Sequence, residues 1–263
     1  MIGDIVGKPG RQVCQQVIPA LREREKLDFV VANAENSAGG SGITKSTTKE
    51  IFESGVDVIT TGDHVFKRKE AYALLDANKN LLRPANYPVS SPGVGSYIYS
   101  VSESLQIGII NLLGRVFLNP IDCPFVCIRD IVEKMSRKTS VILVDFHAEA
   151  TSEKIALGWY LDGKASAVYG THTHVQTADE AILPGGTAYI TDIGMTGPFR
   201  SVLGRDIDAV INRFVTNMPH YFKVAGDDLR LNGVIVKIDC ESGRALSIKR
   251  VQEKIDSHYD AAK

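Results

Sequence analysis

The stretch SAVYGTHTH, residues 166–174, is an apolar run that ends in two histidines one residue apart. Short apolar runs bounded by polar residues are typical of strands buried on both faces. Strands that alternate with helices predict an α/β fold with a parallel sheet. Comparable runs are DFVVANAE (28–35), VDVITTGD (56–63), LQIGIINLLG (105–114) and SVILVDFHAE (140–149). Segments with helical patterns occur among them at 11–26, 45–54, 68–77, 125–137, 152–162 and 207–217.

Two regions break this alternation of strands and helices. Residues 95–114 contain two strand patterns with no helix between them, and residues 231–253 predict a hairpin that turns at Ser242-Gly243. Such hairpins argue against a barrel of eight strands and eight helices. We therefore expect two packed mixed sheets with helices outside them, in a single domain over residues 1–263 whose tail, 253–263, is frayed.

The first strand is unusual, because MIGD supplies only about three residues before Asp4. The loop-like DIVGKPGR that follows resembles the loop after a central strand. Either this strand is short or the chain begins a few residues later than its relatives do.

The composition is that of an ordinary soluble protein, with 44% hydrophobic residues, 23% charged residues and a formal charge of −1. A charge this small predicts no membrane association and no stable nucleic-acid binding. The four cysteines are scattered and no signal-like apolar segment precedes them, so we expect a cytoplasmic protein without a disulfide framework.

Polar side chains follow the ends of the predicted strands. In a parallel sheet such ends converge on one crevice, where ligands bind. Each motif alone has an ordinary explanation, since His-x-His can be surface polarity and Asp can cap a turn. Together, several carboxylates and imidazoles would be costly to bury unless a cation compensates them. The candidates are Asp4, Glu35, Asn36, Asp63, His64, His147, His172 and His174.

The ligand types indicate a class of metal. Oxygen and imidazole ligands without thiolate suit iron, manganese or zinc, and the number of candidate ligands exceeds what one tetrahedral ion needs. Two metal ions, bridged by a carboxylate and a hydroxide, clamp a phosphate and activate water at neutral pH. The sequence therefore predicts hydrolysis of a phosphate ester.

Nearby basic and glycine-rich segments are weaker candidates for binding phosphate. The loop Gly39-Gly40-Ser41-Gly42 would let the backbone approach a phosphate, although it lacks the ending of a P-loop. Loop cations are usually only solvated, so each is a minor candidate. They are Lys8, Arg11, Lys67, Arg68, Arg200 and Arg205.

Six motifs in this order along residues 3 to about 205 resemble the YmdB-like branch of the calcineurin-like metallophosphoesterases. They are GDIVGKPGR, AENSAGGSGIT, TTGDHVF, DFHAEATSEK, GTHTHVQTAD and TDIGMTGP. The resemblance implies a four-layer α-β-β-α sandwich with two metal ions. It implies that one metal is held by Asp4, Glu35, Asn36 and His174, and the other by Asp63, His147 and His172, with Glu35 as the bridge and His64 as a catalytic residue beyond the metals.

The resemblance also implies a function. Similar proteins are phosphodiesterases that act on 3′,5′- or 2′,3′-cyclic nucleotides by attack of a metal-bridging hydroxide, and they tend to be homo-oligomers. One position departs from the pattern, because Asp63 stands where relatives usually have asparagine. Aspartate adds a negative charge and offers no donor, which predicts tighter metal binding and weaker attraction of phosphate. A catalytically weak metal-binding regulatory or scaffold protein is the alternative, and a different metal hydrolase such as an amidohydrolase is a third hypothesis.

Overall fold

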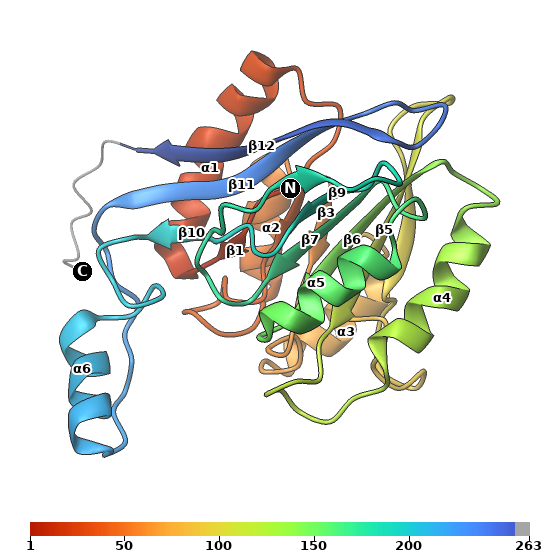
Figure 1. Ribbon diagram of the computed structural model, residues 1–263. Helices are drawn as coiled ribbons and strands as arrows, with labels where there is room; N and C mark the ends of the chain where they lie inside the picture. Colours follow the sequence, from red (N-terminus) through yellow and green to blue (C-terminus); the bar gives the residue numbers. More distant parts are fainter. Residues whose placement is uncertain (256–263) are drawn as a thin grey trace.

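A six-stranded sheet forms one half of the molecule (Figure 1). The computed structural model describes residues 1–255. In this sheet β5, β6, β7 and β9 are parallel, while β4 and β8 are antiparallel edge strands. Across the sheet the strands are β4 (Ser96–Ser100), β5 (Gln106–Leu113), β6 (Val141–His147), β7 (Ala167–Thr171), β9 (Ala188–Ile190) and β8 (Ala181–Ile182).

The other half contains a two-stranded and a four-stranded sheet, joined through Ile2. Isolated bridges pair Ile2 with Ala32 on one side and with Gly233 on the other. The predicted C-terminal hairpin is present and forms the long β11 and β12 ribbon in Figure 1. The strands are β2 (Val31–Asn33) with β3 (Val58–Thr60), and β1 (Asp4–Ile5), β10 (Met195–Pro198), β11 (Leu229–Ile238) and β12 (Ala245–Lys254). The expected mixed α/β architecture is confirmed, and β1 is a short strand.

The helices bury apolar faces against the sheets. In α4, Ile128, Val132 and Met135 are buried at the spacing of one helical face. Buried residues of α1, α2 and α3 share a cluster with β1 and β11, and those of α4 and α5 share another with the six-stranded sheet. Helix α6 stands away from the body in Figure 1. The helices are α1 (Gly7–Glu25), α2 (Lys45–Glu53), α3 (Glu70–Ala77), α4 (Pro124–Met135), α5 (Thr151–Tyr160) and α6 (Ile207–Thr216).

A third apolar cluster lies between the sheets. It joins Val31 and Val234 from one side to Leu143 and Ile190 from the six-stranded sheet. Both faces of β6 are therefore covered, which explains why residues 141–147 read as a continuous apolar run rather than an alternating one.

Several predicted boundaries differ from the structure. Helix α1 begins at Gly7, four residues before the expected start at 11, because a glycine with φ of 60° leads directly from β1 into the helix. The short strands between 181 and 198 were not predicted. Strand β12 continues to Lys254, and the N–H of Ile255 donates to the carbonyl of Leu229 at 3.1 Å, so the prediction of fraying from 253 is wrong for 253–255. The rest of the predicted tail lies outside the described residues.

Within residues 1–255, no helix combines the length and apolar character needed to cross a bilayer.

Candidate metal centre

The carboxyl ends of β2, β3, β6 and β7 bring polar side chains to one place. In β6 and β7, His147 pairs in register with Thr171, so the residues after these strands emerge at the same edge. Glu35 and Asp63 follow β2 and β3 by a few residues. As a result, Glu35, Asp63, His147 and His172 each offer a ligand atom within 4.8 Å of the other three.

Glu35 lies at the centre of these groups. Its Oε1 is 3.2 Å from His147 Nε2 and 3.3 Å from His64 Nδ1, and its Oε2 accepts the backbone N–H of His64 at 3.0 Å. Burial alone would raise the pKa of this carboxyl, but the two imidazoles outweigh burial and hold the pKa well below its usual value. Glu35 thus offers an ionised, buried carboxylate to this cluster.

The second group of contacts joins two imidazoles to Asp63. His147 Nε2 is 3.3 Å from Asp63 Oδ1 and 2.9 Å from His172 Nδ1. Burial, together with the neighbouring His147, lowers the pKa of His172 to about 4. His172 is therefore neutral at physiological pH and retains a lone pair for a metal ion.

His174 and Asn36 approach Glu35 from the other side. The amide nitrogen of Asn36 is 3.2 Å from Glu35 Oε1 and 3.1 Å from His174 Nε2, while Asn36 Oδ1 is 2.9 Å from His64 Nδ1. His174 Nδ1 is 3.1 Å from the carbonyl of Leu203, to which it can only donate. This bond fixes the tautomer and leaves the lone pair on Nε2, directed toward Asn36.

Asp4 completes the set from β1. Its Oδ2 accepts the backbone N–H of His172 at 3.1 Å, and its Oδ1 is 3.7 Å from His147 Nδ1. Burial is the main cause that raises the pKa of Asp4 to about 7, so this carboxyl needs a nearby positive charge to be fully ionised at neutral pH. The structure thus brings all eight predicted site residues into one connected group.

The polar atoms of this group fit divalent cations. Asp4 Oδ1 and Asp63 Oδ1 are buried and accept no hydrogen bond from the described residues. Buried acceptors of this kind are costly unless something compensates them. The donors are carboxylate oxygens and imidazole nitrogens without a thiolate, which matches iron, manganese or zinc rather than a soft metal.

A buried hydrogen-bonded chain orients His147. Its Nδ1 lies 2.9 Å from Thr171 Oγ1, which in turn donates to Asp145 Oδ1 at 2.7 Å. Asp145 is also held by the amide of Asn33 at 3.1 Å and by the hydroxyl of Thr60 at 2.5 Å. Because the hydroxyl of Thr171 occupies Nδ1 of His147, the other ring nitrogen, Nε2, is directed toward Glu35 and Asp63.

A buried ion pair holds the loop that carries the other two histidines. Lys154 of α5 donates to Asp192 Oδ2 and to the carbonyl of Thr171, both at 2.7 Å, and Asp192 Oδ2 also accepts the N–H of Thr173 at 3.1 Å and its hydroxyl at 2.7 Å. His172 and His174 have φ of 99° and 66°, values that side chains disfavour. These bonds supply the constraint that such a backbone needs.

The chain matches the model of a known family, described as YmdB-like protein, over residues 1–251. The chain belongs to the YmdB-like family. A protein of Bacillus subtilis strain 168 named 2′,3′-cyclic-nucleotide 2′-phosphodiesterase is 48% identical over 250 residues, which cover 95% of this chain and 94% of that protein.

Two solved structures resemble this member of the YmdB-like family closely. A hypothetical protein from Thermus thermophilus is 39% identical, with a TM-score of 0.90 over 96% of this chain and 97% of that one. A structure described as a novel phosphatase from Mycoplasma pneumoniae is 34% identical, with a TM-score of 0.90 over 96% of this chain and 92% of its own.

Position 62, beside the candidate metal centre, has no room for a side chain. A Cβ on Gly62 would lie 2.2 Å from His147 Cδ2 and 2.3 Å from Glu35 Oε2. Contacts this short do not occur in real structures, and both neighbours are held in place by their partners. The absence of a side chain at Gly62 therefore lets Asp63 lie close to Glu35 and His147.

Three of the candidate phosphate-binding cations contact the loop after β2. Arg11 donates to the carbonyl of Ser37 at 2.6 Å, Arg68 to that of Ala38 at 3.1 Å, and Arg205 to that of Gly40. Arg11 also forms an ion pair with Glu50. These contacts assign the three arginines a role in shaping the loop.

Sequence reasoning missed several side chains that support the centre. Glu149 Oε2 lies 3.2 Å from His172 Nε2, and neither Asp145 nor Asp192 was a candidate. Glu149 is two residues beyond His147, at the same strand end as a chosen ligand. Asp192 lies in the TDIGMTGP motif and its partner Lys154 ends the DFHAEATSEK motif, 38 positions away, but neither motif indicates that the two side chains pair.

Proposed function

We propose that this protein is a metal-dependent phosphodiesterase that hydrolyses 2′,3′-cyclic nucleotides. The observation that carries the proposal is the partly buried cluster in which Glu35, Asp63, His147 and His172 offer ligand atoms within 4.8 Å of one another. The choice of substrate class rests on the 48% identical relative, which is named as a phosphodiesterase for such nucleotides. The 3′,5′-cyclic nucleotides are the second substrate class to test.

Two metal ions would be held by the seven predicted ligands. Asp4, Glu35, Asn36 and His174 form one set, and Asp63, His147 and His172 form the other, with Glu35 close to both. Iron and manganese suit these ligands best, with zinc as a further candidate. When bound, such ions neutralise phosphoryl charge and lower the pKa of water.

His64 is suited to handle the proton of the leaving group. Its side chain is 29% exposed, so it borders solvent, unlike the fully buried His147. The hydrogen bond that the His64 imidazole donates to the Glu35 carboxylate raises the pKa of His64. A raised pKa keeps the imidazolium populated near neutral pH, so His64 can donate a proton to the departing oxygen or stabilise the phosphoryl charge.

Asp63 sets the charge of the centre. Burial would raise its pKa, but His147 outweighs burial and the pKa is lowered, so Asp63 is ionised. Two divalent ions together with the carboxylates of Asp4, Glu35 and Asp63 would carry a formal net charge of +1. With asparagine at position 63 this net charge would be +2. The chain is therefore expected to retain metal strongly and to attract an anionic substrate less strongly than an asparagine-containing relative.

We also infer the four-layer α-β-β-α arrangement within a single domain, and a cytoplasmic homo-oligomer. The layers are supported by the three apolar clusters, two of them between helices and sheets and one between the sheets. Size-exclusion chromatography with light scattering tests the oligomer.

Turnover of a panel of phosphodiesters tests the proposed activity. Protein loaded with Mn²⁺ is assayed on 2′,3′-cyclic AMP, 3′,5′-cyclic AMP and bis-p-nitrophenyl phosphate, beside protein stripped with chelator. Glu35→Gln should abolish turnover, whereas His220→Asn, a change at an exposed histidine outside the cluster, should leave it intact. Faster turnover of the 3′,5′ isomer would contradict the substrate assignment.

The alternative is a metal-binding scaffold with little catalytic power, which the extra charge of Asp63 favours. Two bound metals per chain with no turnover of any of these substrates, under any metal, would support this alternative and refute the proposed activity.

A further inference from the structure

The imidazole of His172 has one ring nitrogen inside the candidate metal centre and the other at its rim. Nδ1 lies 2.9 Å from His147 Nε2 and 3.6 Å from Asp63 Oδ1. The other nitrogen, Nε2, lies 3.2 Å from Glu149 Oε2. The side chain of Glu149 is 48% exposed, compared with 21% for His172, so this contact joins the centre to the solvent-facing surface.

Two other imidazoles of the centre have a hydrogen-bond partner on one ring nitrogen in the same way. Nδ1 of His174 is 3.1 Å from the carbonyl of Leu203, and Nδ1 of His147 is 2.9 Å from the hydroxyl of Thr171. The first of these partners is backbone and the second is a fully buried side chain. Glu149 is therefore the partner that a substitution can remove without disturbing the backbone or the interior.

The backbone of His172 is held from both sides, but these bonds leave its ring free to turn. The N–H of His172 donates to Asp4 Oδ2 at 3.1 Å, and the carbonyl of Thr171 accepts from Lys154 at 2.7 Å. A half-turn of the ring about the Cβ–Cγ bond would place carbon atoms where the two nitrogens now lie. Because that turn would lose the contact with Glu149, this carboxylate favours the orientation in which Nδ1 enters the centre.

The contact with Glu149 also decides which nitrogen of a neutral ring carries the proton. A carboxylate accepts hydrogen bonds and does not donate them, so Nε2 of His172 is the donor. Nδ1 then keeps its lone pair, beside Asp63 and His147. Metal ions bind the unprotonated nitrogen, and a carboxylate on the opposite nitrogen makes the ring a stronger ligand.

The local fold fixes the place of Glu149, which follows β6 by two residues and lies just before α5. The N–H of Ala148 donates to the carbonyl of Thr171 at 3.4 Å, and the N–H of Lys154 donates to the carbonyl of Ala150 at 3.1 Å. Glu149 thus lies between a residue tied to β7 and the first turn of α5.

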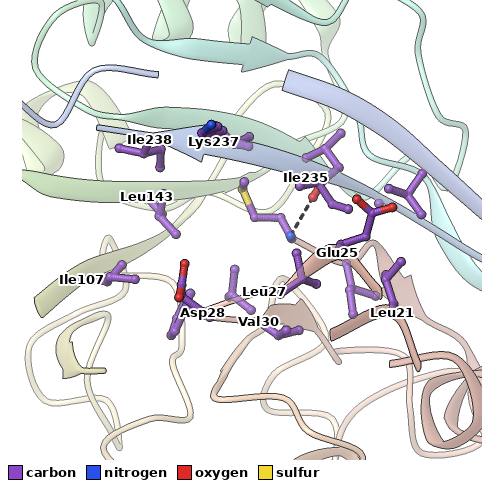
Figure 2. A pocket seen from close by; sticks show the side chains of 18 of the residues that line it. Leu21, Glu25, Leu27, Asp28, Val30, Ile107, Leu143, Ile235, Lys237 and Ile238 are labelled. Atoms are coloured by element: carbon purple, nitrogen blue, oxygen red, sulfur yellow. Dashed lines mark hydrogen bonds between the residues drawn. The ribbon is translucent and has the colours of Figure 1, made fainter. Parts of the chain in front are cut away.

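A cavity of about 590 Å³ at the amino-terminal end of β2 takes no part in this contact (Figure 2). Apolar side chains such as Ile107 and Leu143 form most of its lining, and neither Glu149 nor any of the eight candidate site residues borders it. The group that orients His172 is therefore supplied at the carboxyl edge of the sheet.

We propose that Glu149 is a positioning residue for the metal ion beside Asp63, His147 and His172. It accepts the Nε2–H of His172 and so holds the ring with the lone pair of Nδ1 directed into the centre. Glu149 acts through His172 and is not itself among the residues whose ligand atoms lie within 4.8 Å of one another. The inference rests on the metal centre of the proposed function.

Three variants test this role. Glu149→Ala removes the acceptor, Glu149→Gln keeps an acceptor oxygen without the charge, and Glu23→Ala, at an exposed glutamate near the end of α1, is the matched control. Titration of the full-length apo-proteins with Mn²⁺ against a competing chelator measures the Kd of each ion.

Glu149→Ala should weaken one of the two ions about tenfold or more, because the outer partner of a metal-bound histidine typically contributes about 10–100-fold in affinity. Glu149→Gln should stay within about threefold of the parent, since its amide oxygen still accepts the Nε2–H. Glu23→Ala should match the parent. The Tm values of the apo-proteins should agree within about 2 °C, which shows that the loss of affinity is not a loss of folding.

Equal Kd values for both ions in Glu149→Ala and the parent would overturn the inference. A Glu149→Gln protein as weak as Glu149→Ala would overturn it too, because the charge rather than the accepted hydrogen bond would then set the affinity. Turnover is not measured, so a chain that binds two ions but hydrolyses no phosphodiester would refute the proposed activity and leave the role of Glu149 to be decided by these Kd values.

Discussion

Replacing Lys154 by methionine should destabilise the protein and loosen its metal centre together. Lys154 and Asp192 are 1% and 0% exposed, and the ammonium is 2.7 Å from both Asp192 Oδ2 and the carbonyl of Thr171. Methionine keeps most of the side-chain volume and removes the charge. Asp192 would then be a buried carboxylate without its cation.

The magnitude follows from the burial of both partners. Removing one partner of a buried pair typically costs about 3–5 kcal/mol, because the remaining charge is uncompensated. That is a large part of the roughly 5–15 kcal/mol that stabilises a typical domain. The double variant Lys154→Met/Asp192→Asn removes both charges and should recover about 2 kcal/mol relative to the sum of the single changes.

Urea unfolding of the apo-proteins measures these free energies, and Mn²⁺ retention during dialysis measures the effect on the centre. Lys134→Met, a change at an exposed lysine of α4, is the matched control and should lie within about 0.5 kcal/mol of the parent. A folded Lys154→Met protein that loses less than about 1 kcal/mol and keeps its metal would refute the argument that this pair constrains the loop of His172 and His174.

Three further predictions concern the charge of Asp63, the close packing at Gly62 and the amino group of Met1. Asp63→Asn should raise kcat/KM on a phosphodiester several-fold and shorten the lifetime of bound metal against a chelator; an unchanged or lower kcat/KM would show the charge argument to be wrong. Gly62→Ala should lose metal stoichiometry, because its Cβ would lie 2.2 Å from His147 Cδ2; a variant with full metal content would contradict the steric reasoning. The amino group of Met1 has its pKa lowered from 8.0 to about 5, so the folded state binds fewer protons than the unfolded state in this window and stability falls as pH is lowered from about 8 to 5. Chemical acetylation of Met1 should reduce this slope in urea titrations, and identical slopes would argue against a desolvated amine.

Much of the candidate metal centre could be predicted from the sequence because its residues obey one rule. Glu35, His147 and His172 all follow apolar runs, and the carboxyl ends of parallel strands meet at one edge. The same rule selected Asp4 and Asp63, which lie beside His172 and His147 in the structure, although an aspartate beside a turn is ambiguous on its own.

The supporting interactions could not be predicted in this way. Thr171 and Asp145 reach His147 through cross-strand register, which depends on the packing of β6 against β7. A lysine within a helical pattern, such as Lys154, is usually exposed, yet its side chain is buried against Asp192. Sequence periodicity carries no information about which charged groups will meet inside the fold.

The predicted strand boundaries differ from the structure where tertiary contacts, rather than the local sequence, determine where a strand begins or ends. Strand β8 (Ala181–Ile182) is too short for any periodic pattern, and it exists only through its pairing with β9. The end of β12 is set by β11, to which Lys254 pairs at Arg230.

The central claim is that separate strand ends place their carboxylates and imidazoles around two metal ions. A crystal structure of the Mn²⁺-loaded protein with anomalous data measures this directly. We expect two anomalous peaks per chain, one beside Asp63, His147 and His172, the other beside Asp4, Asn36 and His174, and both beside Glu35. A single peak, or peaks away from Glu35, would contradict it.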